Sequence, residues 1–226
     1  MICLIGTVLK ERYCVMERIG HGGSGRLYLA KDMELGVFRA VKEMPVTRKK
    51  EALLMKRLEH PAIPKIIDYT ENRECCYLIM EYIKGQSLGE LLRSGKEFSM
   101  KETLALGKEI SGVMEYLHSR RPPVCHGDLK PDNLMLSETG HLYLVDLGSA
   151  MFDHGKRKRP CEGTKGYASP EQYQGYLSPG SDIYAFGKTL EMLFGKKKCR
   201  YFLYPEFIWF LFVCTRKKRS TDTQIC

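Results

Sequence analysis

The chain has 226 residues, enough for one large domain or two small ones around a sizeable core. It carries 36 basic and 27 acidic residues, a net charge of +9, and its 43% hydrophobic content excludes a disordered or fibrous protein. No apolar run approaches the roughly 18 residues of a membrane helix, and Met1 to Ile5 lacks the features of a signal peptide. These observations lead us to expect a soluble cytoplasmic protein without a membrane span.

The cysteines and the basic residues exclude further classes of protein. The nine cysteines are scattered without a C-x-x-C pair, which argues against zinc ribbons and fits a reducing cytoplasm. Much of the positive charge lies in three short clusters, at 156–159, 196–198 and 216–219. The clusters lack the interleaved aromatic residues that stack on bases, which argues against nucleic acid binding. Two interpretations remain: a solvated surface, or a surface that recruits an acidic protein partner.

Strands are predicted first along the chain and helices afterwards. Three β-rich runs come first, at Tyr13 to Ile19, Arg26 to Ala30 and Val37 to Met44. Leucines at helical spacing then predict a helix over Lys49 to Leu58. Two more apolar runs, Ile63 to Tyr69 and Cys76 to Ile83, precede a predicted break at Gly85-Gln86-Ser87, and helices are expected over Leu88 to Arg93 and Leu104 to His118. This order predicts an α+β protein of two lobes joined near residue 84.

A glycine-rich element follows the first predicted strand. Gly20-His21-Gly22-Gly23-Ser24-Gly25 has G-x-G-x-x-G spacing, which alone is a weak signal because dinucleotide folds share it. The alternating run Arg26 to Ala30 follows, so the loop joins two strands. That context favours a flap over phosphates, which backbone N–H groups of glycines can approach closely, over a Rossmann turn. A plain β-hairpin turn is the alternative.

A lysine on the next strand is placed to bind phosphate as well. Lys42 ends the run Arg39-Ala40-Val41-Lys42, where its ammonium can meet the α- and β-phosphates of a nucleotide. Glu51 lies on the following predicted helix and can pair with Lys42. Such a pair contributes little on an open surface, but in a dry cleft it aligns a cation with the nucleotide.

The strongest chemical signal is the segment His126-Gly127-Asp128-Leu129-Lys130-Pro131-Asp132-Asn133, followed thirteen residues later by Asp146-Leu147-Gly148. Asn133 offers a carbonyl oxygen and Asp146 a carboxylate, the oxygen ligands that Mg²⁺ prefers. Asp128 can accept a hydrogen bond from an attacking hydroxyl, and Lys130 can neutralise charge on a moving phosphoryl group. The set therefore suits phosphoryl transfer.

Because of the glycine loop, Lys42, and the segments around Asp128 and Asp146, the sequence resembles a protein kinase of the serine/threonine type. The resemblance covers Arg12 to about Thr221, and its further motifs are His60-Pro61, Gly163-Thr164, Ser169-Pro170-Glu171 in place of Ala-Pro-Glu, and Asp182 to Gly187. It implies the two-lobed kinase fold, with a small β-rich N-lobe carrying one regulatory helix and a mainly helical, shortened C-lobe. The implied organisation is one kinase domain over 1–226, with an N-lobe at about 10–83, a hinge at about 81–86 and a C-lobe at about 87–226.

The resemblance also implies the activity, ATP- and Mg-dependent transfer of the γ-phosphate to Ser/Thr hydroxyls of protein substrates. It assigns Asp128 as catalytic base, Lys130 to the γ-phosphate, Lys42 with its orienting Glu51 to the other phosphates, and Asn133 and Asp146 to Mg²⁺. The remaining nucleotide-binding positions that it implies are Gly20, Gly22, Gly25, Leu27, Ala40, Met80 as gatekeeper, Glu81, Ile83 and Met135. Core packing is the alternative for Leu27, Ala40, Met80 and Met135.

The sequence departs from the family at the activation loop. Gly127 stands where most members have an arginine that binds a phosphorylated loop residue. Between Ala150 and Gly163 the chain has no serine, threonine or tyrosine, and the nearest hydroxyls are Ser149, Thr164 and Tyr167. We therefore expect that loop phosphorylation does not switch this enzyme on. The loop instead carries the basic cluster 156–159, for which we expect either solvation or an acidic substrate.

The C-terminal region is short for the family. Phe207 to Val213 is apolar on every face, which suits a buried helix or an exposed association surface. Arg219 can be matched to the arginine that pairs with Glu171 in the family, and the chain stops at Cys226, where the family has a further helix. Two alternatives therefore stand beside the kinase: a pseudokinase scaffold that binds nucleotide or a partner without turnover, and a small-molecule phosphotransferase.

Overall fold

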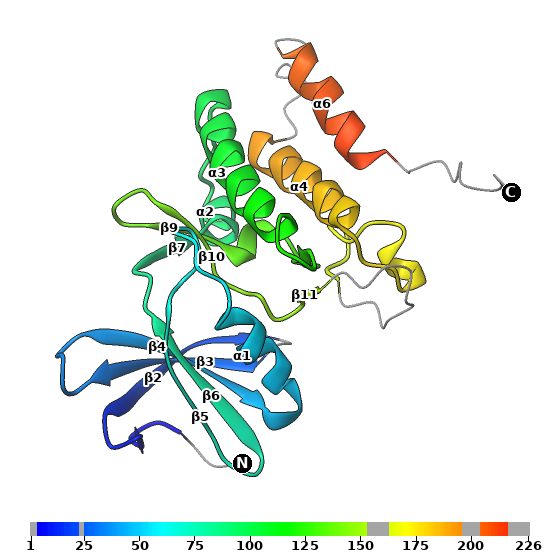
Figure 1. The fold of residues 1–226 in the computed structure, drawn as a ribbon. Helices are drawn as coiled ribbons and strands as arrows, with labels where there is room; N and C mark the ends of the chain where they lie inside the picture. Colours follow the sequence, from blue (N-terminus) through cyan, green and yellow to red (C-terminus); the bar gives the residue numbers. More distant parts are fainter. Residues whose placement is uncertain (1–3, 23–24, 153–162, 196–203, 217–226) are drawn as a thin grey trace, which may run out of the picture. The chain divides into compact units, whose positions relative to one another are not determined.

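The computed structural model describes residues 4–22, 25–152, 163–195 and 204–216 (Figure 1). The chain divides into two compact units. The sheet unit comprises Met1–Leu88 and Asn133–Met151, and the helical unit comprises Gly89–Asp132 and Phe152–Cys226. The chain therefore leaves the sheet unit once, returns to it for a short stretch, and leaves it again.

The sheet unit is built on a six-stranded antiparallel sheet with the order β1-β2-β3-β4-β6-β5. Its strands are β1 (Val8–Leu9), β2 (Tyr13–Gly22), β3 (Gly25–Asp32), β4 (Phe38–Pro45), β5 (Ile66–Glu71) and β6 (Cys75–Glu81). Between β4 and β5 the chain forms η1 (Val46–Arg48) and α1 (Lys49–Met55). The five strands predicted from the apolar runs are present, and Pro45 is the last residue of β4.

The core of this sheet comes from side chains that alternate along neighbouring strands. On β3, Tyr28 and Ala30 point to the interior, and Val41 and Ile79 are fully buried on β4 and β6. Because strand side chains alternate between two faces, β-branched and aromatic residues two apart build one continuous apolar layer. This layer fixes the register in which β4 lies between β3 and β6.

A second, three-stranded sheet completes the sheet unit. It has the order β10-β9-β7, with β7 (Gly85–Ser87), β9 (Leu134–Ser137) and β10 (Leu142–Leu144). The predicted break at residues 85–87 is therefore wrong, because these residues pair with β9. Gly85 permits the pairing: a Cβ at this position would overlap the carbonyl oxygen of Leu136 on the neighbouring strand.

The helical unit is organised around two long helices that lie side by side, α3 (Met100–His118) and α4 (Pro179–Phe194) (Figure 1). Helix α3 begins four residues before the predicted start, at a capping box in which Ser99 and Glu102 exchange side-chain and backbone hydrogen bonds. The other elements are α2 (Leu88–Arg93), β8 (Val124–Cys125), η2 (Pro131–Asn133), η3 (Gln172–Gln174) and α6 (Pro205–Thr215), while β11 (Met151–Phe152) straddles the division between the units.

Helix α6 packs on α4 but leaves much of its apolar surface uncovered. Phe207 and Leu211 are buried, whereas Trp209 and Phe212 are 68% and 61% exposed. The expectation of a buried helix is thus wrong for most of these side chains, because α6 meets the rest of the helical unit along one narrow stripe. The exposure of these side chains agrees better with the alternative, an exposed surface, and association through it stays a prediction.

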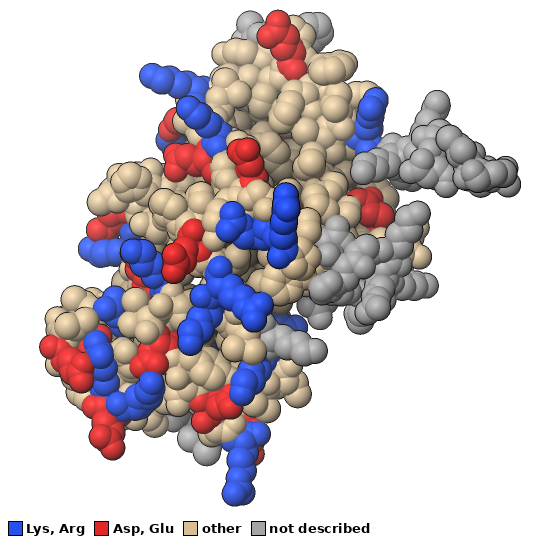
Figure 2. All heavy atoms as spheres, viewed as in Figure 1, with Lys and Arg blue, Asp and Glu red and all other residues tan. Residues whose placement is uncertain are grey.

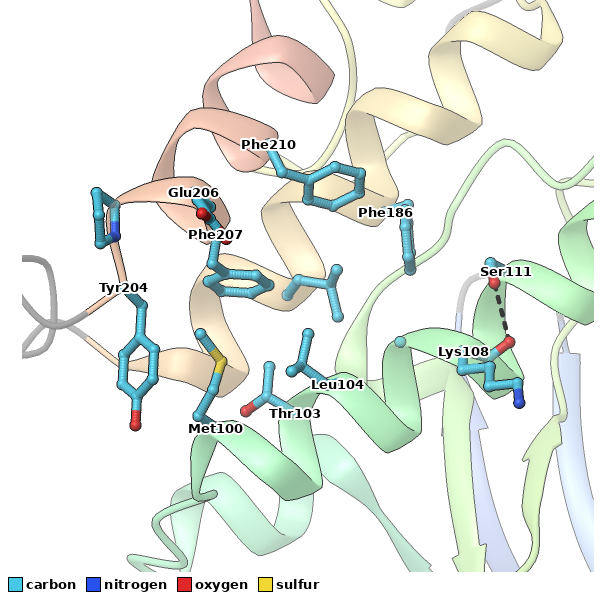
Figure 3. Close-up of a pocket in the computed structure, with 13 residues that line it drawn as sticks. Met100, Thr103, Leu104, Lys108, Ser111, Phe186, Tyr204, Glu206, Phe207 and Phe210 are labelled. Atoms are coloured by element: carbon cyan, nitrogen blue, oxygen red, sulfur yellow. Dashed lines mark hydrogen bonds between the residues drawn. The ribbon is translucent and has the colours of Figure 1, made fainter.

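An apolar groove of about 890 Å³ lies between α3, α4 and α6 (Figure 3). Phe207 and Phe210 of α6 face Phe186 of α4, and Met100 and Leu104 form the α3 side. The ring centroids of Phe186 and Phe210 are 6.3 Å apart in an edge-to-face arrangement. None of the residues predicted for catalysis or nucleotide binding lines this groove.

Charged side chains of both signs are interspersed over the face shown in Figure 2. The helices that the structure describes include none with the length and hydrophobicity needed to cross a membrane.

Candidate active site

Lys42 lies in the centre of the large sheet, on β4. Its register partners are Leu27 on β3 and Leu78 on β6, and the residue is only 7% exposed. Its Nζ donates a hydrogen bond to Oδ1 of Asp146 over 3.0 Å. The same oxygen accepts the backbone N–H of Gly148 at 2.9 Å. The lysine that was expected to bind phosphate is therefore held near an acidic residue predicted for the metal.

The pairing of Lys42 with Glu51 stays a prediction. Glu51 falls within α1, as expected, but its side chain lies outside the described part of the chain. The ion pair between Lys42 and Asp146 was not foreseen from the sequence. It joins residues 104 positions apart, and such a separation leaves no local pattern to detect.

Asn133 and Asp146, the predicted metal ligands, lie on segments joined by a hydrogen bond. The backbone N–H of Val145 donates to the carbonyl oxygen of Asn133 over 3.0 Å. The Asn133 residue is buried, and the Asp146 side chain is 34% exposed. The described residues contain no group of three or more His, Cys, Asp or Glu side chains that could hold a metal ion. Two oxygen donors fit Mg²⁺, which keeps several waters and phosphate oxygens as ligands.

The positions predicted for the adenine and the glycine loop all belong to the sheet unit. Ala40 and Met80 are buried register partners on β4 and β6, and Met135 on β9 pairs with Tyr143 of β10. The structure thus places the predicted adenine-binding side chains on two sheets of one unit. The remaining positions are Leu27 on β3, Glu81 at the end of β6 and the buried Ile83 just beyond it.

The glycine loop joins β2 and β3 as a tight connection, as expected from the sequence. Gly22 and Gly25 are register partners across it, and residues 23–24 lie outside the described part of the chain. Gly25 has φ +143°, and a Cβ there would overlap the carbonyl oxygen of Glu43. A glycine is required at this position. The geometry is compatible with both interpretations, a phosphate flap and a plain hairpin turn.

In the helical unit, Asp128 and Lys130 meet at a threonine. Lys130 Nζ donates to Asp128 Oδ2 at 2.8 Å and to Thr164 Oγ1 at 2.6 Å. The Thr164 hydroxyl donates in turn to Asp128 Oδ1 at 2.7 Å, and the Thr164 backbone N–H donates to the same oxygen at 3.0 Å. A carboxylate and an ammonium are thereby held together, with side chains 16% and 20% exposed.

A buried aspartate supports the loop that carries Asp128. Asp182 on α4 is 1% exposed, and its Oδ2 and Oδ1 accept the backbone N–H groups of His126 and Gly127, each at 2.8 Å. Nε2 of His118 on α3 lies 2.9 Å from Oδ2. Gly127 has φ +80°, a conformation that favours glycine. One carboxylate therefore fixes the peptide groups Cys125–His126 and His126–Gly127, just ahead of Asp128.

Three residues that shape this site were noted in the sequence only as parts of motifs, or were missed. Thr164 and Asp182 were recognised without a contact assigned to either, and Gln172 was not singled out. Gln172 directly follows Ser169-Pro170-Glu171, and an uncharged polar residue beside a recognised motif was the available signal. Buried polar residues with satisfied hydrogen bonds are readily identified in a structure, but the sequence pattern does not distinguish them from exposed polar residues.

Several expectations for the activation loop and the C-terminus concern residues beyond the described ones. The basic cluster 156–159 and Arg219 lie in 153–162 and 217–226, outside the described residues. Glu171, the expected partner of Arg219, accepts a hydrogen bond from Ser181 Oγ over 3.0 Å. Burial raises the pKa of the Tyr167 hydroxyl, one of the few hydroxyls close to the loop.

The comparisons with known proteins agree with these motifs. A family model described as protein kinase domain matches residues 13–201. The chain is 31% identical to serine/threonine-protein kinase PrkC of Bacillus subtilis, over 85% of this chain and 32% of that protein. It is 34% identical to a probable serine/threonine-protein kinase of Streptomyces coelicolor (80% and 30% covered), and 32% identical to PknD of Chlamydia muridarum (88% and 27%).

The chain thus spans about a third of the length of these curated relatives. The family match covers both units, from the second strand of the large sheet to beyond α4. A curled antiparallel sheet followed by a helical region is the two-part architecture that the sequence predicted. With its glycine loop, its buried lysine and its Asp128 loop in this order, the chain belongs to the protein kinase family.

Proposed function

We propose that this chain is a serine/threonine protein kinase domain that transfers the γ-phosphate of Mg-ATP to hydroxyl groups of protein substrates. The observation that supports it most is the hydrogen-bonded set of Asp128, Lys130 and Thr164. A carboxylate held beside an ammonium suits the removal of a proton from an alcohol that attacks phosphorus. The serine/threonine kinases among its relatives support the same substrate class.

In the proposed reaction, the helical unit acts on the acceptor. The substrate hydroxyl oxygen forms a bond to the γ-phosphorus, and the bond from that phosphorus to the β–γ bridging oxygen breaks. The hydroxyl proton passes to a carboxylate oxygen of Asp128, and ADP is released. Lys130 offsets the negative charge of the transferred group as it moves, since an ammonium placed in advance needs no reorganisation during the reaction. The backbone bonds to Asp182 keep Asp128 in place.

The sheet unit binds the nucleotide in this proposal. Lys42 binds the α- and β-phosphates, with its ammonium fixed by Asp146 and by its place on β4. Asn133 and Asp146 hold Mg²⁺, which neutralises phosphate charge when bound. The carboxylate of Asp146 therefore serves two cations, the lysine and the metal. The family's use of these positions supports the assignment residue by residue.

Activity without a phosphorylated loop is the finer part of the proposal. Gly127 carries no side chain that could bind a phosphate, and no serine, threonine or tyrosine lies between Ala150 and Gly163. Recruitment of an acidic protein by the cluster 156–159 stays a prediction from the sequence. The pseudokinase is the alternative, and the catalytic residues present in the chain count against it.

The experiment is transfer of labelled γ-phosphate from Mg-ATP to casein and to the protein itself. Asp128→Asn, with its shape kept and its basic oxygen removed, should reduce transfer by about 10²- to 10⁴-fold. Phosphatase-treated wild type should retain its activity. Wild type that binds ATP without transferring label would favour the pseudokinase, and activity that depends on a phosphorylated loop residue would contradict the finer proposal.

A further inference from the structure

Gln172 lies in residues 163–174, which follow the activation loop and which we call the activation segment, at the point where this segment contacts the loop that carries Asp128. It begins η3 and is 5% exposed. Its side-chain Nε2 donates to the carbonyl oxygen of Gly127 over 2.8 Å, and its Oε1 accepts the backbone N–H of Ser169 at 2.9 Å. One buried amide thus uses a donor and an acceptor at once to join segments 45 residues apart.

The contact completes the support of a single residue. Asp182 binds the N–H of Gly127, and Gln172 binds its carbonyl oxygen. The peptide group that carries this oxygen links Gly127 to Asp128, so fixing it sets the direction in which the Asp128 side chain leaves the backbone. From the other side, Thr164 donates to Asp128 Oδ1 through its N–H and its hydroxyl.

The surrounding backbone is shaped to admit the amide. A Cβ on Gly163 would lie 3.1 Å from Nε2 of Gln172 and 2.7 Å from Cβ of Ala168, so the segment passes close above the amide because residue 163 is a glycine. The backbone N–H of Gln172 also donates to the carbonyl oxygen of Ser169 at 3.0 Å, which closes a turn around the side-chain bond. The side-chain amide thus has one hydrogen bond at its oxygen and one at its nitrogen, and the backbone of residue 163 lies close to it.

We propose that Gln172 is a positioning residue that aligns Asp128 with the activation segment through a permanent, uncharged link. The inference rests on the proposed function, in which Asp128 accepts the substrate proton, and it explains how the alignment can persist without a phosphate. Gly127 offers no side chain to a phosphorylated loop, but its carbonyl oxygen is available to an amide donor. The link needs a donor and an acceptor at fixed places, which an amide of this length supplies and a carboxylate does not.

Gln172→Glu tests the link because it keeps the shape and places an acceptor oxygen opposite the carbonyl of Gly127. Gln172→Met keeps the approximate volume and removes both hydrogen bonds without adding charge. The matched control is Gln174→Glu, the same change on the same short turn, at an exposed position. Kinetics with casein and Mg-ATP, under conditions where circular dichroism shows each variant folded, separate positioning from stability.

Both Gln172 variants should lower kcat by about 10- to 100-fold, the scale of a misplacement near 1 Å, while the KM for ATP stays as in wild type. Gln174→Glu should match wild type in both constants. An unchanged kcat in folded Gln172→Glu and Gln172→Met overturns the proposal. An ATP KM that rises by the same factor also overturns it, since that result would show a general distortion.

Amide hydrogen exchange gives a readout that does not need turnover. The Ser169 N–H should exchange faster in Gln172→Met, which removes its acceptor, than in wild type, while it stays protected in Gln174→Glu; Gln172→Glu keeps the acceptor oxygen and should fall between the two. Equal protection in all four proteins overturns the link. If the wild type transfers no phosphate, the proposed function fails, and this exchange measurement still decides whether Gln172 holds the two segments together.

Discussion

Lys42 and Asp128 are held in place by different kinds of interaction. Lys42 stands on a strand with paired strands on both sides, so its backbone is fixed by a regular ladder and by the apolar layer beneath it. Asp128 stands in a loop and is fixed by side chains distant in sequence, with bonds that span 36 residues to Thr164 and bonds from Asp182 to the two residues before it.

This difference has a consequence for how each position tolerates change. A sheet distributes the support of Lys42 over many backbone hydrogen bonds, none of which depends on one side chain. The support of Asp128 depends on a few buried polar groups, each of which leaves unsatisfied partners when it is removed. Replacing one of these polar residues, although it is far from Asp128 in sequence, should therefore disturb the position of Asp128. A comparable replacement of one side chain in the sheet unit should disturb the position of Lys42 less.

The two largest effects should appear in different kinetic constants. A substitution in the sheet unit should raise the KM for ATP, whereas one in the helical unit should lower kcat alone. Lys42→Met removes the charge that binds phosphate and should lower transfer by about 10²- to 10³-fold, with a raised KM for ATP.

Thr164→Val removes the hydroxyl between Lys130 and Asp128 and should lower kcat by about tenfold, the cost of one hydrogen bond at 1.4 kcal/mol, with the ATP KM unchanged.

Steady-state kinetics with casein as acceptor measures both constants. Thr164→Ser, which keeps the hydroxyl, is the control and should recover most of the lost rate. If Thr164→Val raised the ATP KM as much as Lys42→Met does, the division of roles between the units would be wrong.

The next effect concerns stability in the helical unit. Asp182→Ala leaves the backbone N–H groups of His126 and Gly127 buried without their acceptors, so the free energy of unfolding should fall by about 2–5 kcal/mol. Asp182→Asn keeps one acceptor oxygen and should lose about half as much. Urea denaturation followed by circular dichroism measures both losses. A loss below about 0.5 kcal/mol for Asp182→Ala, as for a surface change, would show that the loop is held by other contacts.

The smallest effect tests a polar contact of the sheet unit through pH. Arg12 donates two hydrogen bonds of 2.8 Å to the fully buried Asp32. These bonds lower the pKa of Asp32 from 3.8 to about 2, and the N–H groups of Leu35 and Glu34 add to the shift. The stabilisation is therefore fully present above about pH 4 and is lost as the pH falls through 2.

The measurement is the difference in unfolding free energy between wild type and Asp32→Asn across pH. It should be constant from about pH 5 to 8 and should shrink as the pH falls below about 4. The control is Glu138→Gln, in an exposed ion pair with Lys84, which should change stability by less than about 1 kcal/mol. A difference that grew on acidification would contradict the assigned role of Asp32.

Much of the fold follows from local patterns in the sequence. The alternation on β3 predicts a strand, since a half-buried strand needs apolar residues two apart. Helix α3 was predicted over most of its length from its apolar spacing, and its start was missed because Met100 to Thr103 belong to a capped first turn with weak periodicity. The three-stranded sheet was missed because Gly85–Ser87 is too short and too polar to show a strand pattern.

The order of residues along the chain establishes which chemical groups are present: the glycine loop, Lys42, the Asp128 segment and Asp146. Motif spacing carries that information because phosphate, metal and proton each require particular side chains. Which groups contact one another depends on the folded chain, as in the hydrogen bonds from Lys42 to Asp146 and from Gln172 to Gly127. These partners lie 104 and 45 residues apart, and the packing of strands and helices brings them within hydrogen-bonding distance.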